Sequence, residues 1–350
     1  MQRTHEIGVV AIGRNEGDRL KRALRSLDAR RERTVYVDSS STDDSVSFAR
    51  SIGVDVVELD TTIPFTAGRA RNAGCDRLLE IAPDVEFVQF VDGDCEVVDG
   101  WIERAAAEIT RDPKLAVVCG RRRERFPHAT IWNRLCDMEW NTPIGRSHAC
   151  GGDALYRVSA FRSAGGFDSR LVAGEEPELC VRIRARGFEI ERVDAEMTLH
   201  DVAMTRASQW WRRASRNGHA IVGALMIHGN DANHDWGRQL FRAVFWATSI
   251  TVASIAAGIG LFSALPWAWK LTLAMLPIAL LALVWARTFV NRSRRGDSVG
   301  DCALYATFVV AGKWAECAGA FQCWRDHASG RRSRWIEYKP IPTRTSGERA

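Results

Sequence analysis

The sequence lacks the patterns that mark several common classes of protein. Its nine cysteines include no CxxC pair, so zinc-finger spacing is absent, and their odd number fits a reducing compartment better than a disulfide framework. No GxGxxG motif is present, which excludes the usual dinucleotide-binding fingerprint. No basic stripe is interleaved with aromatic residues, so we expect no nucleic-acid partner.

The N-terminus also lacks the features of a secretory signal. Residues 1–6 are polar, and the apolar run after them is too short for a signal-peptide core followed by a cleavage site. We therefore expect the N-terminal domain to remain in the cytoplasm. What the chain does contain is thirteen tryptophans, a net charge of +5 and a long uncharged stretch near residue 243. This combination is unusual for a purely soluble protein and favours a membrane surface or phosphorylated ligands as partners.

Apolar runs alternate with helical patterns along the first hundred residues. Strands are predicted at residues 7–12, 34–37, 54–59 and 86–91. Helical patterns fill the intervals, as at Leu20, Leu24 and Leu27, which share one helix face. The alternation predicts an α/β fold with a mostly parallel sheet flanked by helices. In such sheets functional side chains gather at the carboxyl ends of the strands.

Acidic and basic motifs stand where predicted strands end or helices begin. Asp92-Gly93-Asp94 follows a strand, and two carboxylates separated by one small residue can approach a single divalent cation. Asp38 ends another strand and offers a carboxylate to a nucleotide base or ribose. The cations of residues 68–74 stand at a helix start, where a diphosphate is favoured. Each motif alone also fits an ordinary solvated turn or helix cap.

The motifs gain weight from their order along the chain. Asn-Glu, VDSSSTDDS, GRARNAG, DGD, GGD, GGFD and GEEPEL follow one another at residues 15–16, 37–45, 68–74, 92–94, 151–153, 165–168 and 174–179. This order resembles a family 2 glycosyltransferase with the GT-A nucleotide-diphospho-sugar transferase fold, over about residues 6–220. The resemblance implies an enzyme that transfers a sugar from a nucleotide-diphosphate donor, in polysaccharide or other glycan biosynthesis.

The resemblance assigns nucleotide-binding roles to residues of the first three motifs. Asp38 would contact the nucleotide base, with Asn15 and Glu16 in the same nucleotide-binding set. Arg71 and Asn72 would lie near the nucleotide or the diphosphate.

The resemblance also implies a metal site and a sugar contact. Asp94 would bind Mg²⁺ or Mn²⁺ bridging the diphosphate, and Asp92 would contact the ribose or the metal. His200 resembles the downstream histidine that completes the metal site, although a single histidine is more often structural. Asp153 would contact the sugars.

The catalytic base is implied at the start of GEEPEL. Members of the family invert the anomeric centre by direct displacement, and their base is typically the Asp of a Glu-Asp pair. This sequence has Glu175-Glu176 there, which lengthens the side chain by one methylene. Glu176 is the candidate base and Glu175 the alternative. Acidic residues at a helix start also suit the helix dipole without any catalytic role.

A further motif bears on the number of sugars transferred. Gln209-Trp210-Trp211-Arg212-Arg213 partly resembles the Gln-x-x-Arg-Trp signature of processive polysaccharide synthases, but Arg213 stands where the signature has Trp. We therefore expect single-sugar transfer to a lipid-linked or membrane-proximal glycan acceptor. The two tryptophans alternatively pack at a membrane interface.

Two uncharged runs predict a membrane hairpin. Residues 243–262 would form a helix about 30 Å long, which matches the hydrocarbon thickness of a bilayer, and residues 271–286 form a second, shorter run. Arginines flank the pair on both sides and only Lys270 lies in the turn, so both ends should be cytoplasmic. Residues 303–321 include Lys313 and Glu316 and fit an interfacial helix better than a span.

These patterns divide the chain into three parts at the cell membrane. We expect a catalytic domain over residues 1–235 on the cytoplasmic side, a transmembrane hairpin over 236–295, and an interfacial helix with a basic tail over 296–350. The alternatives are a sugar-phosphate nucleotidyltransferase and a non-catalytic membrane scaffold that retains the fold. The first would carry a Gly-rich basic loop after the first strand, which Gly13-Arg14-Asn15-Glu16 is not.

Overall fold

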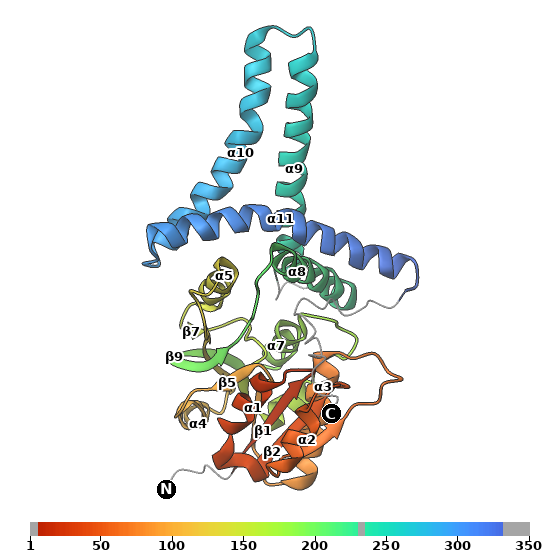
Figure 1. Cartoon of the computed structure of the whole chain (residues 1–350), viewed down its shortest axis with the longest axis vertical. Helices are drawn as coiled ribbons and strands as arrows, with labels where there is room; N and C mark the ends of the chain where they lie inside the picture. Colours follow the sequence, from red (N-terminus) through yellow and green to blue (C-terminus); the bar gives the residue numbers. More distant parts are fainter. Residues whose placement is uncertain (1–5, 230–234, 332–350) are drawn as a thin grey trace, which may run out of the picture. The chain divides into compact units, whose positions relative to one another are not determined.

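The computed structural model describes residues 6–229 and 235–331 (Figure 1). The chain divides into two compact units, the first ending at Thr205 and the second beginning at Arg206.

A nine-stranded sheet forms the centre of the first unit, in the order β3-β2-β1-β4-β8-β6-β9-β5, with β7 paired to β9. The strands are β1 (Ile7–Gly13), β2 (Thr34–Asp38), β3 (Asp55–Glu58), β4 (Phe87–Asp92), β5 (Cys95–Val97), β6 (Leu115–Glu124), β7 (Gly145–Arg146), β8 (Ala154–Arg157) and β9 (Glu189–His200). The helices are α1 (Asp18–Arg25), the 3₁₀ helix η2 (Asp28–Arg33), α2 (Ser45–Ser51), α3 (Ala67–Ile81), α4 (Trp101–Arg111), α5 (Ile131–Trp140), α6 (Val158–Ser163) and α7 (Glu175–Ala185). The four strands predicted over the first hundred residues are confirmed, and helices lie between them as expected. The expected helix face is shorter, because α1 ends at Arg25 and Leu27 packs in a different cluster from Leu20 and Leu24.

Helices cover both faces of the inner parallel strands β1 and β4, which explains why these two strands are almost wholly apolar, whereas the edge strand β3 carries Asp55 and Glu58. Val10 and Ala11 are neighbours in β1 and therefore point to opposite faces. Gly74 of α3 lies so close to Val10 that a Cβ there would overlap the valine side chain. Leu20 and Leu24 of α1 cluster with Ala11 on the other face.

Beyond β4 the sheet is mixed. β8 runs antiparallel to both β4 and β6, and β5 runs antiparallel to β9, whereas β6 and β9 are parallel. β5 begins only three residues after β4 ends, but its partner in the sheet is β9. The parallel arrangement expected from the sequence is therefore found in β1 to β4, and the remaining strands add antiparallel pairs.

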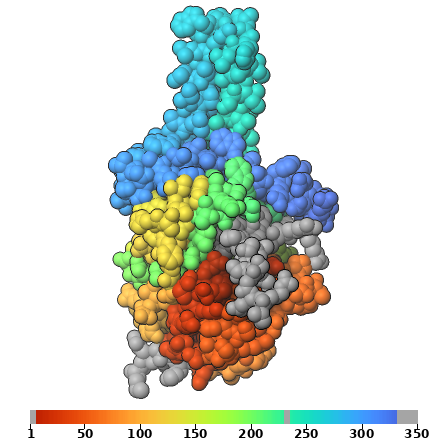
Figure 2. Space-filling model, viewed as in Figure 1, coloured from red at the N-terminus to blue at the C-terminus, as the bar shows by residue number. Residues whose placement is uncertain are grey.

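The second unit is helical and consists of α8 (Ala207–His228), α9 (Trp236–Phe262), α10 (Trp267–Ser293) and α11 (Val299–Ala328). Figure 2 shows α9 and α10 packed side by side as a hairpin. Within the described residues, these two helices are long and apolar enough to cross a membrane. Large apolar side chains on them face outward, including Phe262 at 94% exposure and Trp267 at 77%.

Helix α11 lies across the foot of this hairpin in Figure 1 and packs tightly on α8. A Cβ at Gly218 would overlap the carbonyl oxygen of Glu316, and one at Gly319 would overlap that of Ser215. The two backbones therefore approach closely because both helices have glycine at the contact.

At the start of α8, the Gln209 side chain accepts a hydrogen bond from the Arg206 backbone at 2.9 Å.

Candidate active site

The carboxyl ends of β2 and β4 lie on either side of the end of β1. Gly13 pairs with Asp38, and Ile12 pairs with Asp92, so the two acidic residues stand at the same edge of the sheet. The strand-end positions expected from the sequence are thus realised by parallel pairing.

The Asp38 carboxylate holds the loop that follows β2. It accepts hydrogen bonds from the Tyr36 hydroxyl at 2.8 Å and from the backbone and hydroxyl of Ser41 at 2.7 and 2.5 Å. Asn15 joins this loop to the end of β1, since its backbone donates to the Ser41 hydroxyl and its side chain accepts from the Thr42 backbone. Asp38 and Asn15 therefore shape the edge where a nucleotide is expected.

Two other nucleotide-binding candidates make local contacts. Glu16 lies 3.0 Å from the Arg19 Nε in an ion pair. The Asn72 amide makes two hydrogen bonds to the backbone of Phe167, donating to its oxygen at 2.8 Å and accepting from its nitrogen at 2.9 Å. Asn72 thus fixes the GGFD loop against α3.

Arg71 is the buried cation of the site, with 2% of its side chain exposed. Its guanidinium contacts Asp92 at 2.7 Å, Glu175 at 2.8 Å and Glu176 at 3.3 Å. Gly152 passes so close that a Cβ there would overlap the Arg71 Nη2. The GGD motif therefore requires glycine at this point because α3, β4 and α7 meet here.

A second arginine, which the sequence did not single out, completes the ion network. Arg122 Nη2 lies 3.1 Å from Asp92 Oδ2 and 2.8 Å from Asp153 Oδ2. Asp153 is fully buried and also accepts from the Thr198 hydroxyl at 2.7 Å and from the Asp92 backbone at 3.0 Å. Strand periodicity was the available signal, because the central residue of Arg121-Arg122-Arg123 points to the face opposite its two neighbours.

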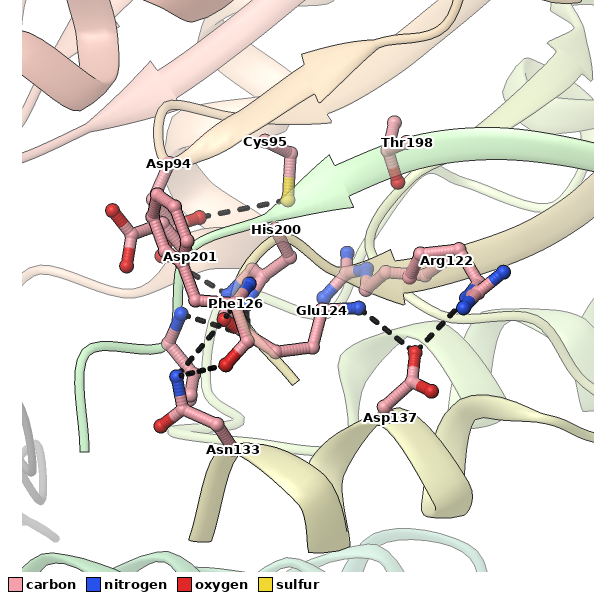
Figure 3. A network of polar contacts seen from close by, with 12 residues as sticks. Asp94, Cys95, Arg122, Glu124, Phe126, Asn133, Asp137, Thr198, His200 and Asp201 are labelled. Carbon is pink, nitrogen blue, oxygen red and sulfur yellow. Dashed lines mark hydrogen bonds and ion pairs between the residues drawn. The ribbon is translucent and has the colours of Figure 1, made fainter. Parts of the chain in front are cut away.

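Asp94 and His200 face each other on the other side of the DGD turn (Figure 3). His200 Nε2 lies 3.1 Å from Asp94 Oδ2, and both side chains are buried. Candidate ligand atoms of Asp94, Cys95 and His200 lie within 4.8 Å of one another, and so do those of Asp92, Cys95 and Asp153. The expected metal-binding residues thus fall into two adjacent groups.

Cys95 belongs to both groups, so the other residues decide which group suits a metal ion. Burial holds the pKa of the Cys95 thiol well above its usual range, so the thiol is neutral and a poor ligand for Mg²⁺ or Mn²⁺, which prefer oxygen. Asp92 is contacted by two guanidinium groups, Arg71 and Arg122. Asp94 with His200 therefore fits a divalent cation better, as a carboxylate beside an imidazole.

The two glutamates at the start of α7 differ in burial and in the contacts of their side chains. Glu175 is buried, and its carboxylate accepts a hydrogen bond from Arg71 Nη1 at 2.8 Å. It is therefore poorly placed to reach a substrate. The Glu176 side chain is 17% exposed. Burial and the nearby charge of Glu175 raise the pKa of Glu176 to about 7, against an opposing effect of Arg71. A carboxylate with this pKa suits proton transfer near neutral pH.

Replacement of Arg71 tests the ion network. Arg71→Met should lower the free energy of unfolding by about 3–5 kcal/mol, because removing the cation from a buried pair leaves its carboxylates uncompensated. Arg77→Met on the same helix is the matched control, since Arg77 also pairs with two acids but at the surface, and we expect little change. Denaturant unfolding of both variants in detergent checks this, and equal losses would contradict the special status of Arg71.

Comparison with known proteins shows which class of enzyme this site belongs to. Residues 9–164 match the family described as Glycosyl transferase family 2. These residues form a family 2 glycosyltransferase domain, and the GT-A fold and the enzyme class predicted from the sequence are confirmed.

Relatives of known name are distant. Pre-mycofactocin glycosyltransferases of two Mycobacterium tuberculosis strains, CDC 1551 / Oshkosh and H37Rv, are 26% identical over 239 residues, 64% of this chain and 48% of theirs. The chain thus spans about half the length of these curated relatives. Among solved structures, a mannosyltransferase from Pyrobaculum calidifontis in complex with GDP-Man and Mn²⁺ aligns with a TM-score of 0.56 at 16% identity, covering 92% of this chain and 87% of that one.

Proposed function

We propose that this chain transfers a single sugar from a nucleotide-diphosphate donor to a lipid-linked or membrane-proximal glycan acceptor, with inversion and with a divalent metal. The observation that carries the proposal is the pair of sites joined by Arg71. Glu176, a carboxylate with a pKa of about 7, lies on one side of this arginine, and Asp92 of the DGD turn lies on the other. A base and a diphosphate site are the two parts that direct displacement requires.

Glu176 would act on the acceptor hydroxyl. As the hydroxyl oxygen forms its bond to the anomeric carbon, the proton passes to the Glu176 carboxylate. The bond from that carbon to the diphosphate breaks, and its electron pair leaves with the diphosphate. Attack from the side opposite the leaving group inverts the anomeric centre. Arg71 keeps the Glu176 pKa from rising further, so that the carboxylate is ionised near neutral pH.

Asp94 and His200 are the residues that would hold Mg²⁺ or Mn²⁺. The fit rests on two buried ligand groups 3.1 Å apart, Asp94 in the turn that follows β4 and His200 at the end of β9. When bound, a divalent cation offsets the negative charge that develops on the leaving diphosphate. The Pyrobaculum neighbour, which was solved with GDP-Man and Mn²⁺, supports both a nucleotide-sugar donor and a metal.

A transfer assay tests the proposal. Membrane vesicles containing the full chain would be given radiolabelled UDP- and GDP-sugars with Mn²⁺, and label would be followed into the lipid extract. We expect incorporation from one donor that stops on addition of EDTA and yields products one sugar longer than the acceptor. Pre-mycofactocin belongs in the acceptor panel because of the name of the curated relatives. Incorporation that is insensitive to EDTA, or a long polymer, would contradict the proposal.

The hairpin supports a membrane location. We propose that α9 and α10 cross the bilayer with both chain ends in the cytoplasm, since Arg238 and Arg242 precede the uncharged runs of these helices and Arg287 and Arg292 follow them. The division into a catalytic domain over 1–235, a hairpin over 236–295 and a C-terminal part over 296–350 stays a prediction.

Protease accessibility measures this topology. In inside-out vesicles, protease should remove tags from both the N-terminus and the C-terminus, because both face the outside of such vesicles. Right-side-out vesicles are the control and should protect both tags. A C-terminal tag that is protected while the N-terminal tag is lost would require a third crossing, and α11 would then span the membrane.

A further inference from the structure

Three strands meet at His200 and bring a second carboxylate to it. In the sheet, His200 pairs with Cys95 of β5 on one side and with Glu124 of β6 on the other. Backbone hydrogen bonds fix this register, from Arg125 to the His200 oxygen at 2.8 Å and from Asp201 to the Asp94 oxygen at 3.2 Å. The histidine backbone therefore has little freedom to move relative to either carboxylate.

Glu124 is buried and its carboxylate is held from several directions (Figure 3). Oε1 accepts from the Phe126 backbone and from the Asn133 side chain, each at 3.1 Å. Oε2 accepts from the Val202 backbone at 3.1 Å and lies 3.7 Å from His200 Nδ1. One carboxylate thus ties the start of α5 and the segment after β9 to a point beside the imidazole.

The His200 ring has two unlike sides. Nε2 faces Asp94 at 3.1 Å, whereas Nδ1 is buried and has no hydrogen-bond partner among residues 6–229 and 235–331. Trp140 packs edge-on against the ring, with centroids 4.7 Å apart, and so opposes rotation. A buried N–H without a partner is costly, and Glu124 Oε2, 3.7 Å away, is the carboxylate oxygen that faces Nδ1.

We propose that Glu124 is a positioning residue that keeps the His200 proton on Nδ1 and so leaves Nε2 free to bind a divalent cation together with Asp94. The proposal rests on the metal role given to Asp94 and His200 under the proposed function. A carboxylate behind a histidine ligand fixes the tautomer and the ring orientation and strengthens the ligand, and its loss typically weakens metal affinity about 10- to 100-fold. Glu124 would act through His200 and contact neither the donor nor the metal.

A purely structural role for Glu124 makes a different prediction. If the carboxylate only satisfies backbone and amide donors, then removing one of those donors should matter as much as removing the charge. Asn133→Ala provides that comparison, because it removes a partner of Glu124 and leaves the carboxylate facing His200 in place. Loss of stability is expected in both variants, so stability alone does not separate the two roles.

Mn²⁺ affinity separates them. The full chain in detergent would be titrated with Mn²⁺ and the free ion followed by electron paramagnetic resonance. We expect Glu124→Gln to weaken binding about 10- to 100-fold and Asn133→Ala to leave it near the parental value. In a His200→Ala background, Glu124→Gln should cause no further loss, because a residue that acts through another has no effect once that residue is removed.

Three results would overturn the proposal: unchanged affinity in Glu124→Gln, equal losses in Glu124→Gln and Asn133→Ala, or a full additional loss in the His200→Ala background. Should Glu124→Gln not fold, Glu124→Asp retains the charge but withdraws it by one methylene, and unchanged affinity there would also overturn the proposal. Failure of the parental chain to bind Mn²⁺ is a distinct result, because it would remove the metal site of the proposed function itself.

Discussion

Glu176→Gln is expected to slow sugar transfer about 10²- to 10⁴-fold and to leave donor affinity nearly constant. Gln retains the size of the side chain but cannot accept the proton of the acceptor hydroxyl. Donor binding is assigned to the edge formed by Asp38 and to the metal site, whereas Glu176 contacts Arg71 at 3.3 Å. Initial rates of transfer and the donor Kd, measured on the same preparation, test the loss of rate and the unchanged affinity.

The pH profile gives an independent readout of the same role. Because the pKa of Glu176 is raised to about 7, the carboxylate is ionised above that pH and protonated below it. Transfer by the parental chain should therefore fall as the pH drops through about 7. The Glu176→Gln variant should lack this limb, whereas Glu176→Asp, which restores the usual residue of the family, should retain it with partial activity.

Glu175→Gln is the matched control. Glu175 is buried against Arg71, so its replacement should reduce stability through the ion network. Because the charge of Glu175 helps to raise the pKa of Glu176, the pH limb should be retained but should move to lower pH. The assignment of the base fails if Glu176→Gln transfers sugar at the parental rate and Glu175→Gln is inactive.

Asp94→Asn is expected to abolish metal-dependent donor binding. Asn is similar in shape but lacks the charge that attracts a divalent cation, and Asp94 is the carboxylate that faces His200. Binding of a nucleoside diphosphate with and without Mn²⁺, followed by calorimetry, measures the effect. Asp99→Asn is the control, because Asp99 is exposed and lies five residues farther along the chain. If folded Asp94→Asn binds donor with Mn²⁺ as the parental chain does, the metal is held elsewhere.

The sequence was informative where function depends on local order. Apolar runs located β1, β2 and β4, and parallel pairing of these strands places Asp38 and Asp92 at one edge. Both positions follow from the rule that side chains at the carboxyl ends of parallel strands meet. The uncharged runs likewise located α9 and α10, although the helices continue past these runs through Arg238 and Arg292 because a charged side chain does not end a helix.

The rest depends on pairings between distant segments. Glu124 and His200 are 76 residues apart and meet only because β9 lies between β5 and β6, a register that no local pattern specifies. Arg122 is the central residue of a run of three arginines. The alternation of side chains along a strand was the one signal that could have distinguished it from its two neighbours. Glu175 and Glu176 are neighbours with the same chemistry, and only the position of Arg71 distinguishes the buried one from the candidate base.

A thermal-shift panel of nucleoside diphosphates measures whether this chain binds a nucleotide-diphosphate donor together with a divalent metal, on which the proposed function depends. The full chain would be heated in detergent with each nucleotide, with and without Mn²⁺. A ligand at 100 times its Kd adds about 2.7 kcal/mol to stability, so a clear rise in Tm is expected. At least one nucleoside diphosphate should raise the Tm with Mn²⁺ and much less without it, and Asp94→Asn should remove the difference. A parental chain whose Tm responds to no nucleoside diphosphate, or responds equally with and without Mn²⁺, would contradict metal-dependent donor binding.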